Sequence, residues 1–506
     1  WEIPESPVRA HVRLRVDGGP LELARLQWQA AGIHPDARLA LAASILGSLS
    51  LLALSLAGLG LRASFGGAVA ILAALAVLAP FDAFAAVHLA RRLSWASGAG
   101  IVVLLLARLL ARGASARLRA LVFGALLFKS ALLFHPRFYF YDWPIHETLL
   151  ELLYHRGAID FRTRLVDYQL AHNIGVAPVG DERLAFPYPV AFYYAAHLGN
   201  RLHHAPELWL KLTAAVLAAL ALLPLGYLAR RLTTHAQADL YAALAYLLVP
   251  SLTRSLLLLE LSAVAGCFFD LLALAALASL ELKLDRRERF LFAALAMAAS
   301  LAAYTTGFVH FGLFVGSALV LGLGVRNIRG EAFQPKDAVR LALAGLLALV
   351  LGLLAYPAEA VSGLGKVLRR QEVASPASVE GLPVDEMASA VSRARTFLGI
   401  PLILFGVAGL AIGLRKLPPS SLRLLYLSWA LSALVAIALR YVFIDLFQYQ
   451  KEMYWAAAIL AVGAGALAAS ARQPAFAAGL LVALLVSYAW ALRRMVEQFY
   501  ETYLFL

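Results

Sequence analysis

The chain is dominated by apolar stretches, each long enough to cross a lipid bilayer as a helix. About fourteen segments of roughly 20 residues are rich in Leu, Ala and Val. They lie near residues 39–61, 66–88, 94–111, 118–135, 207–229, 237–252, 258–281, 290–304, 307–325, 338–356, 396–414, 421–440, 452–470 and 475–492. Hydrophobic residues make up 62% of the chain and charged residues 15%, whereas soluble proteins carry about 25% charged residues. The sequence therefore predicts an all-α polytopic membrane protein with about 13–14 transmembrane helices.

The charges are distributed as the positive-inside rule requires. Lys and Arg number 44 against 31 Asp and Glu, a net charge of +13. With the 136–206 segment placed outside, the inner turns near 112–119, 230–236 and 283–289 are rich in Arg and Lys, and the short outer turns are poor in them. No basic stripe carries interleaved aromatic residues, so nucleic-acid binding is not expected. The Arg-, Ala- and Leu-rich composition is typical of a bacterial protein, which favours a multi-pass protein of the cytoplasmic (inner) membrane.

Two segments on the outer side are too long to be simple connections. We expect an external β-hairpin-like segment at residues 1–37 and N-terminal transmembrane helices at 38–112. A core at 113–356 includes the large external loop 136–206. A second external loop at 357–395 and C-terminal transmembrane helices at 396–506 follow. Long loops are usually functional or disordered, so we expect the functional site on the outer face, among short interfacial helices. The chain opens at Trp1 rather than Met, which indicates a processed or incomplete chain whose hairpin ends a larger domain.

The first external loop carries the most informative residues. Asp142 follows an aromatic run where a helix emerges from the bilayer, and His146 lies four residues further on, so the two side chains can share a helix face. A carboxylate beside an imidazole and aromatic rings suits base catalysis on a sugar hydroxyl, or metal binding. The alternative is structural, because Asp142 can cap the helix while Glu147 favours its positive end. Spacing alone favours this second interpretation.

A second aromatic stretch in the same loop starts at Pro187-Tyr188-Pro189 and predicts an amphipathic helix along the membrane interface. The ring of Tyr188 and its neighbours would shape a groove for a lipid tail or a sugar. The alternative is an aromatic belt that anchors the protein at the interface, and the stretch on its own favours that interpretation.

Several charged residues lie at or near the outer ends of predicted spans, where charges are costly and often functional. Glu260 stands at the outer end of one helix, six residues after Arg254, and Arg440 and Lys451 lie near the outer surface. Such cations would bind a lipid phosphate. Each charge alone is more simply explained as a snorkelling or paired side chain.

The order of these motifs resembles the GT-C superfamily of integral-membrane glycosyltransferases, in particular an uncharacterised bacterial branch. The resemblance rests on Asp142-x-x-x-His146, a helix ending at Gly157, Phe186-Pro187-Tyr188-Pro189 with its aromatic helix, and Glu260 in LLLLELSAVAG. It covers about residues 117–325, and more weakly the chain to residue 470. The Asp-x-Asp or Asp-x-Glu pattern of several GT-C families is absent, since position 144 is Pro.

The resemblance implies a membrane glycosyltransferase that moves a sugar from a polyprenyl-phosphate carrier to a glycan, lipid or protein acceptor on the extracytoplasmic face. Asp142 would be the base, His146 and Glu260 would assist it, and Arg254, Arg440, Lys451 and Tyr188 would bind the substrate or its phosphate. A divalent cation is a possible cofactor. Two other classes stay open: a non-catalytic structural subunit that binds partners in a membrane complex, and a transporter of lipids or solutes.

Overall fold

A computed structural model of the chain describes most of its apolar part and several connecting segments. The described residues are 35–110, 113–136, 143–172, 176–179, 182–185, 189–257, 260–324, 333–357, 361, 395–442, 449–471 and 473–503. All but the last three residues of the predicted hairpin segment, and most of the second external loop, lie outside the described residues. Asp142 and Tyr188 also lie outside them.

The described residues fold mainly into helices. The helices are α1 (Pro35–Leu56), α2 (Leu61–Leu78), α3 (Ala83–Leu110), α4 (Ala116–Phe134), α5 (Trp143–His172), α6 (Ala191–Leu202), α7 (Pro206–Leu220), α8 (Leu222–Thr233), α9 (Ala238–Leu247), α10 (Pro250–Leu257), α11 (Leu261–Ser279), α12 (Arg287–Ala303), α13 (Thr306–Gly324), α15 (Pro335–Leu353), α18 (Ile400–Lys416), α19 (Ser421–Val442), α20 (Tyr449–Ser470) and α21 (Pro474–Tyr503). Two short strands, β1 (Val176–Val179) and β2 (Glu182–Ala185), pair antiparallel. The predicted all-α class is therefore correct apart from this small sheet, which the sequence analysis did not anticipate.

Each of the predicted apolar stretches coincides with one helix or with two consecutive helices. Within the described residues, nine helical segments are long and apolar enough to cross a membrane, and the pair α9–α10, bent by 49°, would make ten. Four further helices, α4, α12, α15 and α18, have 17 to 19 residues. At 1.5 Å per residue they are about 25–29 Å long, close to the thickness of the hydrocarbon core. The predicted number of 13–14 is reached when these four are included.

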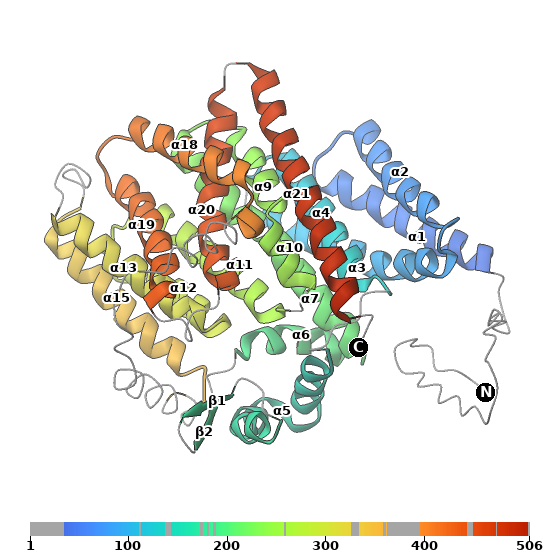
Figure 1. Ribbon diagram of the computed structural model, residues 1–506, viewed down its shortest axis with the longest axis horizontal. Helices are drawn as coiled ribbons and strands as arrows, with labels where there is room; N and C mark the ends of the chain where they lie inside the picture. Colours follow the sequence, from blue (N-terminus) through green and yellow to red (C-terminus); the bar gives the residue numbers. More distant parts are fainter. Residues whose placement is uncertain are drawn as a thin grey trace.

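The helices pack around two hydrophobic cores. The larger core joins α4 and most of the helices from α5 to α21. The smaller one joins α1 and α3 to the neighbouring faces of α4 and α7, through side chains such as Leu46, Leu89, Phe123 and Leu212. Figure 1 shows α1, α2 and α3 at one flank of the molecule, beside the main bundle. The N-terminal helices thus form an appended unit that shares α4 and α7 with the bundle.

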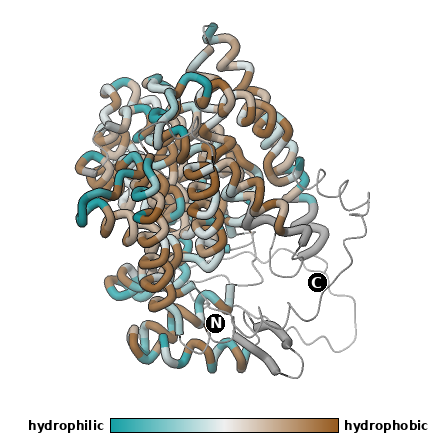
Figure 2. The backbone as a smooth tube through the Cα atoms, turned by 90° about the vertical axis from the view of Figure 1, so that its left-hand side faces the viewer, coloured by the Kyte–Doolittle hydropathy of each residue, from teal (hydrophilic) through white to brown (hydrophobic). Residues whose placement is uncertain are grey.

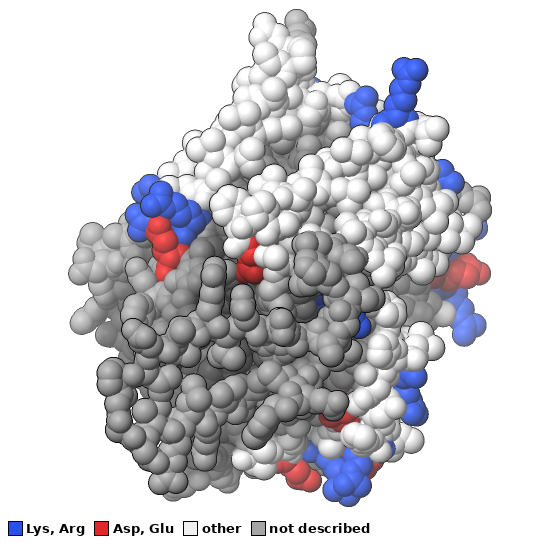
Figure 3. All heavy atoms as spheres, turned by 90° about the vertical axis from the view of Figure 1, so that its right-hand side faces the viewer, with Lys and Arg blue, Asp and Glu red and all other residues white. Residues whose placement is uncertain are grey.

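The outer surface of the bundle is largely apolar. Many apolar side chains on the long helices expose more than half of their surface, among them Val77, Leu109, Val320 and Leu404. Figure 2 shows hydrophobic residues along most of the helical tubes, and Figure 3 shows a broad uncharged surface with the charged side chains in separate groups. Soluble monomers rarely expose contiguous apolar patches of this kind. The exposed apolar side chains therefore face lipid.

The closest helix packing joins α18 and α20 through glycine. Gly406 and Gly409 of α18 lie against Gly463 of α20, and a Cβ atom added at Gly409 would overlap the Gly463 carbonyl oxygen. In a membrane no hydrophobic driving force brings helices together, so small residues that allow close backbone contact are favoured at helix interfaces. These glycines allow α20 to reach the centre of the bundle, where its side chains from Met453 to Ile459 are buried.

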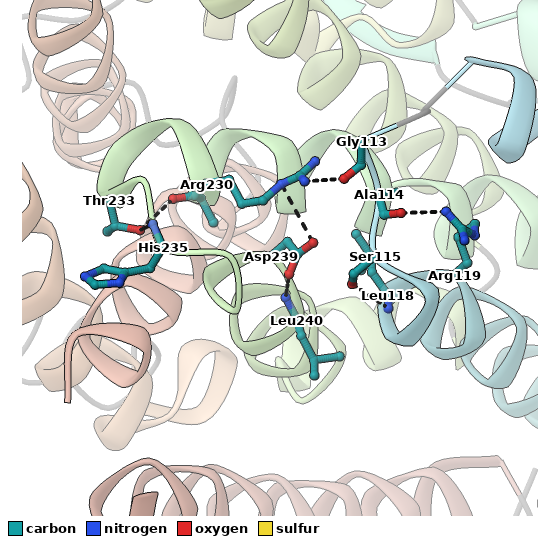
Figure 4. A network of polar contacts seen from close by, with 11 residues as sticks. Gly113, Ala114, Ser115, Leu118, Arg119, Arg230, Thr233, His235, Asp239 and Leu240 are labelled. Carbon is teal, nitrogen blue, oxygen red and sulfur yellow. Dashed lines mark hydrogen bonds and ion pairs between the residues drawn. The ribbon is translucent and has the colours of Figure 1, made fainter. Parts of the chain in front are cut away.

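Polar contacts at one end of the bundle join consecutive helices. Arg230, at the end of α8, donates to the carbonyl oxygen of Gly113 before α4, and its Nε lies 3.7 Å from Asp239 of α9 (Figure 4). Arg231 pairs with Glu281, just after α11, at 2.7 Å. These contacts place the end of α8, the start of α9 and the end of α11 together.

The opposite end of the bundle carries α5 and α6, which do not cross it. The chain passes from α6 directly into α7, and Trp209 of α7 donates to the carbonyl oxygen of His203 after α6. Because α7–α8 runs from α6 to Arg231, and Arg231 meets the far end of α11, α11 must begin at the α5–α6 end. In Figure 1 the α5–α6 segment and the β1–β2 sheet lie together at the bottom of the molecule.

Gly157 divides α5 into two parts. It adopts φ +77°, a conformation that glycine accepts readily, at the position where the sequence predicted a helix end.

Candidate functional site at the α5–α6 end

Of the predicted site residues, the structure describes three fully. His146, Arg254 and Glu260 have described side chains, whereas Arg440 and Lys451 are placed only as backbone positions, near the end of α19 and the start of α20. Asp142 and Tyr188 lie outside the described residues, so their predicted roles stay predictions. The site is therefore built from the three placed side chains and their partners.

His146 is held between α5 and α6. Its Nδ1 atom lies 2.6 Å from the hydroxyl oxygen of Tyr193 on α6, and the two rings stack with centroids 6.0 Å apart. Only 5% of His146 and none of Tyr193 is exposed. The imidazole therefore fixes the first turn of α5, which begins at the residue after Asp142, against α6. Tyr193 was not singled out from the sequence, although the FYY run that contains it is visible there.

Glu260 stands at the N-cap of α11, but its side chain makes no capping bond to that helix. Its carboxylate accepts a hydrogen bond from the Tyr454 hydroxyl on α20 instead. Tyr454 is buried, with 4% of its surface exposed, and Lys451 lies three residues earlier on the same helix. The structure thus brings the predicted acidic residue to the first turns of α20. Nothing in the sequence spacing signals Tyr454 as its partner.

Arg254 lies on α10 and packs against an aromatic ring. Its guanidinium carbon is 5.0 Å from the centroid of the Phe397 ring, a residue that follows the second external loop. A cation over an aromatic face is worth about 0.5–2 kcal/mol, depending on how far water is excluded. Arg254 therefore links α10 to the segment that enters α18. Its predicted role in binding a phosphate stays a prediction.

A charged cluster that the sequence analysis missed lies beside the start of α5. Lys211 of α7 pairs with Glu207 at 2.7 Å, and Glu207 also lies 3.7 Å from Arg92 of α3. The Lys211 ammonium is 5.1 Å from the centroid of Trp143, the first residue of α5. The Glu207–Lys211 spacing of four residues is the signal that could have revealed this pair. The cluster ties the appended N-terminal unit to the residue next to Asp142.

Acidic and basic groups also lie inside the bundle. Asp270 of α11 accepts hydrogen bonds from Ser300 of α12 and pairs with Nδ1 of His310 on α13 at 2.7 Å. Both Asp270 and His310 are buried. Asp270 is visible in the sequence as an acidic residue within the predicted span 258–281, but its partners are not. Charges at this depth are costly unless they are paired, which explains why the pair occurs.

Lys129 of α4 faces a small internal cavity. The cavity has a volume of about 20 Å³ and is lined in part by Lys129, Tyr246, Ser255 and Cys267. A polar cavity of this size has room for one water molecule. Cys267 lies on this wall and is half-buried within the bundle.

The surface of α5 and α6 is rich in histidine. His155 and His204 approach Glu151 at 3.3 and 3.1 Å, and the ring of Tyr154 lies against both. Burial, aided by the positive charge of Arg201, lowers the pKa of His197 on α6. Within the described ranges, no group of three or more His, Cys, Asp or Glu residues has the arrangement of a metal site. The predicted divalent cation therefore depends on Asp142 and its surroundings and stays a prediction.

The apolar spans and lipid-facing surface define a multi-pass membrane protein, with polar groups gathered at the α5–α6 end. No family model matches the sequence, and no curated protein matches it.

Among solved structures, the chain is similar to the oligosaccharyltransferase of Archaeoglobus fulgidus. The apo form is 15% identical, with a TM-score of 0.47 over 74% of this chain and 55% of that chain. The complex of this oligosaccharyltransferase with Zn and sulfate is 17% identical, with a TM-score of 0.42 over 76% of this chain and 52% of that chain. The archaeal oligosaccharyltransferase AglB from Archaeoglobus fulgidus, in complex with an inhibitory peptide and a dolichol-phosphate, is 15% identical, with a TM-score of 0.44 over 74% of this chain and 55% of that chain. The chain thus spans about half the length of these structures.

Proposed function

We propose that the protein is a GT-C-type glycosyltransferase that transfers a sugar from a polyprenyl-phosphate carrier to an acceptor on the extracytoplasmic face of a bacterial inner membrane. The acceptor is a glycan, lipid or protein. The observation that carries the proposal is that three of the predicted groups lie at the same end of the bundle. His146, Arg254 and Glu260, from three separate helical segments, all lie at the α5–α6 end, and α20 enters there with Lys451.

In the proposed reaction, Asp142 removes the proton from an acceptor hydroxyl as its oxygen attacks the anomeric carbon. The bond from that carbon to the phosphate oxygen breaks with inversion, and the polyprenyl phosphate leaves with the electron pair. Cations near the outer helix ends, Arg254, Arg440 and Lys451, stabilise the phosphate as its charge grows. His146 holds the first turn of α5 in place, Glu260 assists Asp142, and Tyr188 contacts the sugar or the lipid.

The test is transfer activity of the full chain in lipid nanodiscs, with a panel of polyprenyl-phosphate sugars and mixed acceptors. Asp142→Asn should reduce transfer by at least about a hundredfold, the usual contribution of a general base. The matched control is Asp160→Asn, which removes an exposed carboxylate of α5 that pairs with Arg164. If Asp142→Asn folds and transfers as fast as the control, Asp142 is not the base. Activity that survives chelation of divalent ions would exclude the cation as a requirement.

A second candidate is a structural subunit of a membrane complex. It is favoured by the appended unit, because only 17% of the α2 span is buried, against 72% of the α11 span. A partner helix covering α2 would account for this difference. Purification in mild detergent tests this candidate: a stable complex lost on Phe65→Ser and Val69→Ser would support it, since both side chains are exposed on α2.

A further inference from the structure

Two neighbouring residues of α20 connect to two acidic residues at different depths, Tyr454 directly to Glu260 and Trp455 through His310 to Asp270. Tyr454 donates to the carboxylate of Glu260. Trp455, the next residue, stacks on the imidazole of His310 with ring centroids 4.7 Å apart and planes 10° apart, and His310 pairs with Asp270. The first turns of α20 therefore connect the buried pair to the carboxylate at the α5–α6 end.

Trp455 is fixed more firmly than packing alone requires. Its indole N–H donates to the hydroxyl of Ser432 on α19 at 3.0 Å, and the rings of Trp429 and Phe311 lie within 5.7 Å of its own. Only 2% of Trp455 is exposed. Because adjacent residues of a helix share one rigid backbone segment, fixing Trp455 restricts where the Tyr454 hydroxyl can lie.

His310 is fixed in turn by Asp270. The imidazole has Trp455 on one face and the Asp270 carboxylate at its Nδ1 atom, while Ser300 of α12 donates to the other oxygen of Asp270. A buried Asp–His pair is a rigid element, since removing either partner leaves a polar group in an apolar interior. Packing alone does not need a charged pair here, because apolar residues of similar size can fill a membrane-protein core.

We propose that Tyr454 is a positioning residue for Glu260, and that the Asp270–His310 pair holds Tyr454 in place through Trp455. The proposal rests on the proposed function, in which Glu260 belongs to the site. The Tyr454 hydroxyl donates directly to the Glu260 carboxylate and so restrains its orientation. The hydroxyl also favours the ionised carboxylate, as hydrogen bonds to a charged form do.

The first test compares Tyr454→Phe with a matched control, Tyr488→Phe, in the full chain in nanodiscs. Tyr488 is also buried and hydrogen-bonded, but it lies on α21 and its hydroxyl bonds to Thr253 of α10, at 2.9 Å, instead of to Glu260. Tyr454→Phe should lower kcat about tenfold with little change in KM, and should move the acid limb of the rate profile to higher pH by about one unit. Tyr488→Phe should leave the profile in place.

The second test asks whether the effect passes through Glu260. His310→Phe should reproduce the Tyr454→Phe effect, and His310→Asn, which keeps a donor toward Asp270, should restore part of the activity. In a Glu260→Gln background, Tyr454→Phe and His310→Phe should have no further effect on the rate, because residues that act as one unit are not additive. Additive losses, or an unshifted profile for Tyr454→Phe, would overturn the proposal.

A third measurement separates this proposal from the proposed function. The infrared carboxylate band of Glu260, assigned with Glu260→Gln, should shift in Tyr454→Phe and in His310→Phe but not in Tyr488→Phe. If the wild-type chain transfers no sugar yet the band shifts as expected, the proposed function fails and the positioning by Tyr454 stands. If the band is unchanged in both Tyr454→Phe and His310→Phe, the proposal that Tyr454 positions Glu260 is wrong, whether or not the chain transfers a sugar.

Discussion

Arg231 at the end of α8 and Glu281 beyond α11 form an ion pair of 2.7 Å that joins the C-terminal ends of two helices running in the same direction. This pair lies at the end of the bundle opposite α5 and α6. It fixes the relative height of α8 and α11, and hence the level at which Glu260 meets α20. Four measurements would test this and other features of the structure.

The ion pair should make stability depend on pH in the acid range. The hydrogen bond from Arg231 lowers the pKa of Glu281 below its ordinary value of 4.5. A carboxyl group with a lowered pKa contributes stability above its unfolded value and loses it as pH falls through the folded value. Because both side chains are partly exposed, Glu281→Gln should cost only about 0.5 kcal/mol at pH 7. Unfolding in mixed micelles should show that this difference shrinks as the pH falls below 4.5 and vanishes below the lowered pKa of Glu281. A difference that does not change with pH would show that the ion pair does not stabilise the protein.

Gly409→Ala should weaken the contact between α18 and α20. The added methyl group would overlap the Gly463 carbonyl oxygen, so the helices must separate, at a cost of about 1–3 kcal/mol. The midpoint of unfolding in mixed micelles measures this loss. Gly312→Ala on α13 is the control, since an added Cβ there meets nothing within 4 Å. Equal stabilities of the two variants would show that the close helix contact is absent.

Tyr193→Phe should loosen α5 from α6 without unfolding the bundle. It removes the hydroxyl that lies 2.6 Å from Nδ1 of His146, a buried hydrogen bond worth about 1–2 kcal/mol. Amide hydrogen exchange should then rise in the first turns of α5 and in α6, while exchange in α11 and α20 stays slow. Unchanged exchange in α5 would indicate that other contacts hold it. Tyr168→Phe, on the second half of α5, serves as the control.

Arg254→Gln should weaken binding of the phosphate-linked donor in the proposed reaction. The loss of one cation near the phosphate should raise KM for the donor about tenfold, since a charge-assisted hydrogen bond is worth about 1.5–3 kcal/mol. The control is Arg289→Gln, an exposed arginine of α12 that pairs with Asp285 near the opposite end of the bundle. A KM for Arg254→Gln that equals the control value would place the phosphate elsewhere.

The apolar stretches of the sequence determined the number and the approximate limits of the helices. A segment of about 20 apolar residues has few stable alternatives in a bilayer, because each backbone group must be bonded within the segment. The predicted stretches therefore match α1 through α21 closely. The largest errors fall on α2, which ends at Leu78 rather than near residue 88, on α3, which begins at Ala83 rather than near 94, and on α21, which ends at Tyr503 rather than near 492. Between α2 and α3 the apolar run continues through both helices, and only the turn after Leu78 separates them.

The sequence also located the polar residues at the α5–α6 end, since a charge at the edge of an apolar span is visible in one dimension. Their partners are not visible in this way. Tyr454 lies 194 residues from Glu260, and His310 lies 40 residues from Asp270. Such pairs depend on which helix faces touch, and in a chain this apolar the faces differ little in composition. The tertiary packing alone, set by small residues such as Gly409 and by paired buried charges, decided which polar side chains meet.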